Sequence, residues 1–172
     1  LRLEAELSVA DPQAREHIAA DIEQLDAIIN KFLDYARPGD MVLTPVSLND
    51  MVQSCVAPFR KREDMVLKIA LEPHLVVLAD PVELQRILTN LLENAGRYGK
   101  SVDTGLAMVD ISARYHEKWV LLRIRDHGTG VDPNQIKQLT TPFFRGEAAR
   151  TAANGAGLGL AIVDKTVARM SG

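Results

Sequence analysis

The feature that most constrains the fold is a stripe of apolar residues near the start of the chain. Its members recur at intervals of four and three, at Ile18, Ile22, Leu25, Ile29, Phe32 and Ala36. This spacing is typical of the seam of a coiled coil or helical bundle. Asp11-Pro12 supplies an N-cap and a first-position proline, and Pro38-Gly39 ends the run. The helix could pack on its own domain, but we favour a bundle between chains because so long a seam needs a partner of similar length.

A shorter helix is expected before it. Leu1, Leu3 and Leu7 lie among good helix formers, and this stretch ends before Asp11. It supplies only about two turns. We therefore expect residues 1–38 to be a partial dimerisation hairpin cut at its N-terminus, residues 39–46 to be a linker, and residues 47–172 to be a second domain.

Composition limits the function classes. The 172 residues, 47% hydrophobic and 25% charged, suit one globular domain with an appendage. A net charge of -3 provides no basic field, so we expect no nucleic-acid partner, and a polyphosphate ligand must be held by local donors. Cys55 is the only cysteine, which excludes an intrachain disulfide. Apolar stretches such as 75–79 are far shorter than the roughly 18 residues of a membrane span.

The second domain alternates helices and short strands. Caps, prolines and residue periodicity predict the following elements: a strand at 44–46, a helix from Ser47 to about Arg62, strands near 66–71 and 75–78 joined by a turn at Glu72-Pro73-His74, a helix from Pro81 to about Tyr98, a β-hairpin over 109–124 turning near Glu117-Lys118, and a final helix carrying Leu160 to Met170. The closing Ser171-Gly172 resembles a helix C-cap that leads into further structure, so we expect truncation there too.

The helix over 83–98 has two contrasting faces. Leu84, Leu88, Leu91, Leu92 and Ala95 form an apolar face, and the opposite face holds Arg86, Asn90, Asn94 and Arg97. Asparagine is a poor helix former, which argues against a merely solvated face. An amide oxygen can ligate Mg²⁺, and a guanidinium can contact phosphate. Ligand binding and simple solvation both remain open for this helix alone.

A second signal is Asp126-His127-Gly128-Thr129-Gly130 at the end of a strand. Alternation places Asp126 on the inward, apolar face, where a charge needs a partner. The partner could be the chain itself, in an Asx turn over Gly128, or an amine-bearing ligand such as adenine. We interpret His127 as a flanking surface residue.

A third signal opens the last helix, at Asn154-Gly155-Ala156-Gly157-Leu158-Gly159-Leu160. Glycines weaken a helix start, but free N–H groups and the helix dipole there make an anion site. The segment lacks the Walker and dinucleotide-binding spacings. Pro142-Phe143-Phe144-Arg145-Gly146 precedes it, and the small residues between have the composition of a mobile lid. A flexible hinge, with the phenylalanines as simple anchors, is the alternative.

The order of these segments resembles the N, G1, F and G2 boxes of bacterial sensor histidine kinases. The matching residues are Asn90-Leu-Leu-Glu-Asn94-Ala, Asp126-x-Gly-x-Gly130, Pro-Phe-Phe-Arg and Gly155-x-Gly-Leu-Gly-Leu. Gly96-Arg97-Tyr98-Gly99 and the stretch 144–151 resemble the osmosensor (EnvZ-type) subfamily in particular. The resemblance implies an α+β two-layer sandwich of the histidine kinase, gyrase and chaperone type, preceded by an α-helical hairpin that forms a dimeric four-helix bundle.

The resemblance also implies a role for each residue. Asn94 would ligate the Mg²⁺ that bridges the ATP phosphates, with Asn90 and Arg97 near those phosphates, and these three would form the catalytic set. The implied nucleotide contacts are Asn94, Arg97, Tyr98, Asp126, Gly128, Gly130, Phe143, Phe144, Arg145, Arg150, Gly155, Gly157, Leu158 and Gly159. Within that set, Asp126 would read the adenine amino group, and the glycines from Gly155 to Gly159 would hold the lid end against the triphosphate.

The implied parent reaction passes the γ-phosphoryl of ATP to a histidine and then to the aspartate of a response regulator receiver domain. The family's phosphoacceptor motif is absent, since none of His17, His74, His116 and His127 has its context. We therefore expect no autophosphorylation by the chain alone. The resemblance implies a location at the cytoplasmic side of the bacterial inner membrane, with membrane contact only through missing N-terminal segments.

Two rival functions remain. One is an ATP hydrolase of the related gyrase and chaperone superfamily, in which a glutamate one turn before the metal-binding asparagine activates water. Here that position is Asn90, which cannot take a proton from water. The other rival is a non-catalytic nucleotide-binding or dimerisation module.

Overall fold

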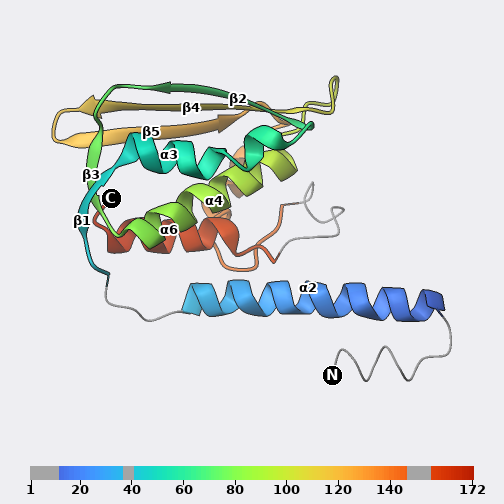
Figure 1. Ribbon diagram of the computed structural model, residues 1–172. Helices are drawn as coiled ribbons and strands as arrows, with labels where there is room; N and C mark the ends of the chain where they lie inside the picture. Colours follow the sequence, from blue (N-terminus) through green and yellow to red (C-terminus); the bar gives the residue numbers. More distant parts are fainter. Residues whose placement is uncertain (1–11, 37–40, 147–155) are drawn as a thin grey trace.

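The computed structural model describes residues 12–36, 41–146 and 156–172 (Figure 1). Strands β2 (Met65–Leu71), β4 (Ala107–His116) and β5 (Trp119–Asp126) form one layer. Helices α3 (Leu48–Val56) and α4 (Pro81–Tyr98) lie against one face of this layer, and α6 (Gly159–Arg169) packs on α4. A long helix, α2 (Pro12–Ala36), runs along the far side of the helical layer. The α+β sandwich expected from the sequence is therefore present.

The sheet order differs from the simplest interpretation of the sequence. β2 pairs in parallel with β4, and β4 pairs antiparallel with β5 through the expected turn at Glu117-Lys118. Strands 65–71 and 76–79 do not pair with each other. Instead β3 (Val76–Ala79) pairs antiparallel with β1 (Thr44–Ser47), which begins within the expected linker 39–46. His74, with a φ of 59°, turns the chain out of the main sheet between β2 and β3.

Local capping explains where the helices begin and end. The Oγ of Ser47 accepts a hydrogen bond from the N–H of Asp50 at 3.3 Å and starts α3 as expected. α3 ends at Val56, earlier than the predicted Arg62, because Pro58 has no N–H for the helical ladder. A short 3₁₀ turn, η1 (Phe59–Lys61), follows it, and a second, η2 (Pro133–Gln138), lies after β5.

The core lies between the main sheet and the helices. Val109, Ile111 and Ala113 of β4 are buried against Leu88 and Leu92 of α4, as the helical wheel predicted. Cys55 of α3 is also part of this core, and burial raises the pKa of its thiol, which stays protonated at neutral pH. The opposite face of the sheet carries no helix among the described residues.

Helix α2 has the predicted length, but much of its seam is exposed in the single chain. Leu25, Ile29 and Phe32 are 57%, 52% and 46% exposed. The expected first helix lies outside the described residues, so the hairpin, the four-helix bundle and dimerisation through residues 1–38 remain predictions. No helix within the described ranges is long and apolar enough to cross a membrane.

Candidate functional site

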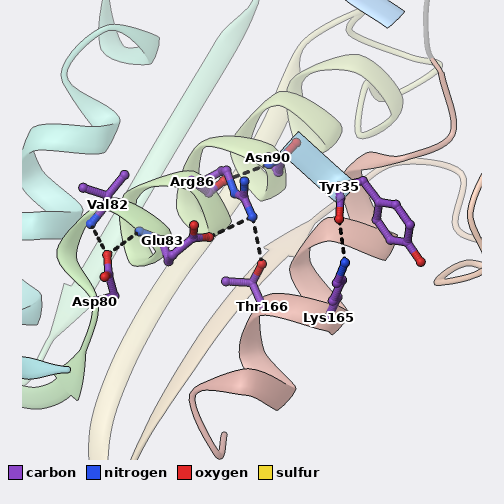
Figure 2. Close-up of polar contacts among 8 residues, drawn as sticks. All are labelled: Tyr35, Asp80, Val82, Glu83, Arg86, Asn90, Lys165 and Thr166. Carbon is purple, nitrogen blue, oxygen red and sulfur yellow. Dashed lines mark hydrogen bonds and ion pairs between the residues drawn. The ribbon is translucent and has the colours of Figure 1, made fainter. Parts of the chain in front are cut away.

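Helix α4 carries the polar face and begins at a strong cap. Asp80 accepts hydrogen bonds at Oδ1 from the N–H groups of Val82 and Glu83, at 3.0 and 3.2 Å (Figure 2). Its Oδ2 accepts a third from the N–H of Val42 at 3.1 Å. These backbone donors hold the pKa of Asp80 below its ordinary value. The helix and its amide-bearing face are thereby fixed to the chain that enters the domain.

The two asparagines of α4 meet the glycine-rich start of α6. A methyl group built on Gly159 would stand 3.4 Å from Oδ1 of Asn90 and 3.4 Å from Nδ2 of Asn94. Two signals that are far apart in the sequence therefore adjoin in space. The Nδ2 of Asn90 donates to the carbonyl of Arg86 at 2.9 Å (Figure 2). Its Oδ1 is the atom that lies toward Gly159.

The start of α6 presents backbone donors. Its N-cap residue, Leu158, offers no side-chain hydrogen bond to the first turn. The first N–H groups of a helix have no partner within it, and the helix dipole adds positive potential there. The side chain of Leu158 is buried, 1% exposed, so only its backbone can face a ligand. This end of α6, facing two amides, is suited to hold an anion.

Arg86 lies on the same helical face but has structural partners. Its guanidinium pairs with Glu83 at 2.8 Å and donates to the hydroxyl of the buried Thr166 at 3.3 Å (Figure 2). It therefore ties α4 to α6. Arg97 and Tyr98 lie in the last turn of α4 and are exposed.

Asp126 corrects one of our expectations. Its side chain is exposed, although strand alternation placed it inside. The reason is that α4 ends at Tyr98, so in the described part of the chain only the backbone of Gly99 lies against Cβ of Asp126 and the carboxylate stays exposed. Its Oδ1 accepts the N–H of Gly128 at 3.0 Å, which is the Asx turn that the sequence left open.

Two glycines bring this turn against the end of α4. A methyl group on Gly128 would lie 2.5 Å from the carbonyl oxygen of Tyr98, and one on Gly99 would lie 2.6 Å from Cβ of Asp126. Only glycine permits both approaches. Gly130 has a φ of 76° and open space around it. Asp126 is thus held beside Tyr98, at the opposite end of the polar face from Arg86.

His127 and Asp110 form an exposed pair behind the turn. His127 Nε2 lies 2.7 Å from Oδ2 of Asp110. The hydrogen bond to His127 holds the pKa of Asp110 below its ordinary value. This contact agrees with a surface role for His127.

The segment after η2 contacts the glycine-rich start of α6. The N–H of Phe143 donates to the carbonyl of Gly157 at 2.9 Å, and both residues have positive φ, 64° and 66°. A methyl group on Gly157 would lie 2.8 Å from the backbone of Phe143 and of Phe144. Phe143 is 57% exposed, and Phe144 and Arg145 are half-buried. Arg150 and Gly155 lie outside the described residues.

Helix α2 reaches the same region, which the sequence did not indicate. The ring of Phe32 stacks on Phe143, with centroids 6.4 Å apart. Lys31 pairs with Glu93 of α4 at 3.2 Å. Lys165 of α6 donates to the carbonyl of Tyr35 at 2.6 Å and lies over that ring (Figure 2). The alternating charges on these helices gave no signal that would identify the pairs.

The donor set fits a hard cation held jointly with a ligand. Among the described residues no group of three or more His, Cys, Asp or Glu could hold a metal. Mg²⁺ ordinarily takes one or two protein oxygens and completes its shell with phosphates and water. The amide oxygen of Asn94 beside the start of α6 is compatible with that arrangement.

Comparison with known proteins decides the family. A family model described as histidine kinase-, DNA gyrase B-, and HSP90-like ATPase matches residues 79–172. The chain belongs to this ATPase family. The matched range holds α4, the Asp126 turn and the glycine-rich start of α6, so the ATP-binding α+β fold expected from the sequence is confirmed.

The relatives are sensor kinases. MprB of Mycobacterium avium (strain 104), a signal transduction histidine-protein kinase/phosphatase, is 30% identical over 164 residues, covering 93% of this chain and 30% of MprB. The chain thus spans about 30% of the length of that curated relative. The NMR structure of the histidine kinase domain of the E. coli osmosensor EnvZ has 30% identity and a TM-score of 0.55, covering 79% of this chain and 80% of that one.

A third similarity concerns the fold alone. Full-length ShkA in complex with AMPPNP has a TM-score of 0.73 and 23% identity, covering 97% of this chain and 36% of that one. The family model and the MprB match show that the ATPase domain of our chain is of the sensor histidine kinase type, which confirms the resemblance at family level.

Proposed function

We propose that the chain is the ATP-binding catalytic core of a sensor histidine kinase of the EnvZ type. The reaction would transfer the γ-phosphoryl of ATP to a histidine, and from there to the aspartate of a response regulator. The observation that carries the proposal is the contact of Gly159 with the amides of Asn90 and Asn94. It joins a hard-cation ligand to an anion-binding helix end within one site.

The phosphates would lie between α4 and the start of α6. Asn94 would ligate Mg²⁺, which supplies charge neutralisation on the phosphate oxygens. Asn90 would lie near those oxygens, the backbone from Gly157 to Gly159 would donate to them, and Arg97 would contribute charge at the last turn of α4. Such a site works by positioning and electrostatics, which suits phosphoryl transfer with little acid-base machinery.

The adenine would lie at the other end of the polar face. Asp126 uses Oδ1 in its own turn, and Oδ2 accepts no hydrogen bond from the described residues. An adenine amino group would donate to that oxygen, with Tyr98 bordering the ring and Gly128 and Gly130 shaping the floor. Phe143, Phe144 and Arg145, with Arg150 and Gly155, would close the site over the phosphates.

The remaining roles extend beyond the domain. We propose that the acceptor histidine and any membrane segment lie outside residues 1–172, and that the seam of α2 pairs with a second copy. Exposed Leu25, Ile29 and Phe32 support such pairing. The working location would be the cytoplasmic side of a bacterial inner membrane.

A second candidate function, steady ATP hydrolysis, is disfavoured by two contacts. The Nδ2 of Asn90 is engaged with the carbonyl of Arg86, and an amide has no proton-accepting strength at neutral pH. The nearby carboxylate of Glu93 is paired with Lys31 of α2, away from Gly159. Neither residue is equipped to activate water.

The test uses labelled ATP and a version of the chain extended upstream through the family's phosphoacceptor segment. We expect acid-labile, base-stable phosphate on the extended protein and its loss in Asn94→Ala. Mixing the unextended chain with an isolated acceptor segment should give the same product in trans. Steady release of phosphate without protein labelling, abolished by Asn90→Ala, would instead support the hydrolase.

A further inference from the structure

The face of the main sheet turned away from the helices carries ordered rows of side chains. Strand register places Lys68, Asp110 and Arg125 side by side in one row, and Ala70, Ser112 and Arg123 in the next. Arg114 and Leu121 oppose each other in the third row. The inward residues of these strands pack on the core, so the named side chains all project outward.

A groove of about 550 Å³ lies on this face. Ala70 and Ser112 have small side chains in the middle of the sheet, and taller neighbours rise around them. Arg114, Leu121 and Arg123 also line the groove. Leu121 is 43% exposed, which leaves an apolar patch at the edge of the hollow.

The groove is cationic on an otherwise acidic protein, whose net charge is -3. Neither Arg114 nor Arg123 makes a hydrogen bond or ion pair with any described residue. The carboxylate that lines the groove, Glu72, already accepts the N–H of Tyr115 at 2.8 Å. The next carboxylate along the face, Asp110, is engaged by His127. The two arginines therefore retain their donors for an outside acceptor.

The spacing of the arginines selects a type of acceptor. Register opposes Arg114 to Leu121, so Arg123 is its diagonal neighbour across β4 and β5. Diagonal neighbours lie roughly 7 to 8 Å apart. Alternate residues of an extended chain are separated by about 6.6 Å and point to one side. Two carboxylates at alternate positions of an extended segment match this pair.

We propose that this groove docks an extended acidic segment of a partner protein. Carboxylates at alternate positions would pair with Arg114 and Arg123, and an apolar side chain of the same segment would cover Leu121, which lies directly opposite Arg114. The positive charges of Arg114 and Arg123 favour an acidic partner over a neutral or basic one. The docking face is on the opposite side of the sheet from Asn94 and Gly159, so a partner and a nucleotide can be bound together.

The test measures fluorescence anisotropy of a labelled peptide with two glutamates and a leucine at successive alternate positions, separated by threonines. A peptide of the same composition with adjacent glutamates is the matched control, because adjacent side chains point to opposite sides. We expect the alternate peptide to bind at least about fivefold more tightly, with affinity falling as salt rises. Equal binding of the two peptides would overturn the proposal.

Matched protein variants locate the site. Arg114→Gln/Arg123→Gln should weaken binding by about five- to tenfold, since each exposed charge pair contributes modestly. Arg60→Gln/Lys61→Gln removes the same charge near η1 and should leave binding within about twofold. Equal losses in both double variants would mean attraction to net charge and contradict the proposal.

Three further measurements separate other occupants. Saturation with Mg-ATP should leave peptide affinity unchanged, and competition would place the peptide in the nucleotide site. Self-association of the parent chain that is lost in the Arg114/Arg123 variant would show that the groove binds a second copy, and would overturn the assignment. Tighter binding of a single-stranded oligonucleotide than of the peptide would also overturn it. Thermal unfolding of each variant should match the parent chain, because these side chains are at the surface.

Discussion

Substitution of Gly128 by alanine tests whether the Asp126 turn and the end of α4 act as one unit. The added methyl would meet the carbonyl oxygen of Tyr98 at 2.5 Å and Cα of Gly99 at 2.7 Å. Ordinary contacts begin near 3.4 Å, so the turn must move by about 1 Å. Both neighbours are backbone atoms, which cannot swing aside.

The expected cost follows from that clash. Forcing a methyl group into a packed contact costs about 1–3 kcal/mol, and the lower entropy of the unfolded chain returns about 0.5 kcal/mol. Gly128→Ala should therefore lower the free energy of unfolding by about 0.5–2.5 kcal/mol. Because Asp126 and Tyr98 separate, the affinity for a non-hydrolysable ATP analogue should fall by about tenfold.

The assays are urea denaturation and calorimetric titration, with Gly105→Ala as the control. Gly105 also disfavours a side chain, through a φ of 67°, but nothing lies within 4 Å of its built methyl. It should lose about 1 kcal/mol of stability and no nucleotide affinity. Parent-like stability and affinity in Gly128→Ala would show that the Asp126 turn and the end of α4 do not depend on each other.

Three further predictions concern single contacts. Asp80→Ala should cost about 1 kcal/mol in urea denaturation through loss of the α4 cap, and Asp80→Asn should cost less; equal values would contradict the cap. Lys165→Met removes the hydrogen bond to the Tyr35 carbonyl and should lower amide protection in the last turns of α2 by about tenfold, with unchanged exchange as the contrary result. NMR titration should find the pKa of Asp110 below that of an unperturbed aspartate, and His127→Asn should raise it. The stabilising effect of this depressed pKa is present above the unfolded value and is lost as pH falls through the folded value.

Local chemistry made much of the fold predictable. The caps at Ser47 and Asp80 and the hairpin turn at Glu117-Lys118 depend on neighbours within a few residues, and the structure has each of them. Pairing of β1 with β3, by contrast, depends on how the chain leaves β2 through His74. Such long-range register leaves little trace in periodicity.

In the candidate site, too, local features were predictable and long-range contacts were not. The sequence placed Asn90 and Asn94 on one helical face, and their contact with Gly159 is the kind of juxtaposition that ordered motifs suggested. The burial predicted for Asp126 was wrong. Alternation along a strand indicates which face of the sheet a residue is on, but not whether a helix covers that residue. The contact of Phe32 with Phe143 joins two exposed rings, whose pairing no local pattern encodes.

The most direct test of the account follows backbone and side-chain amide signals by NMR while a non-hydrolysable ATP analogue is added with Mg²⁺. We expect the side-chain amide of Asn94 and the N–H groups of Gly159 and Gly128 to shift together and to saturate at one ligand concentration. Removal of Mg²⁺ should diminish the Asn94 response most. Saturation without movement of these three groups, or no saturable binding, would contradict a single nucleotide site between α4, α6 and the Asp126 turn.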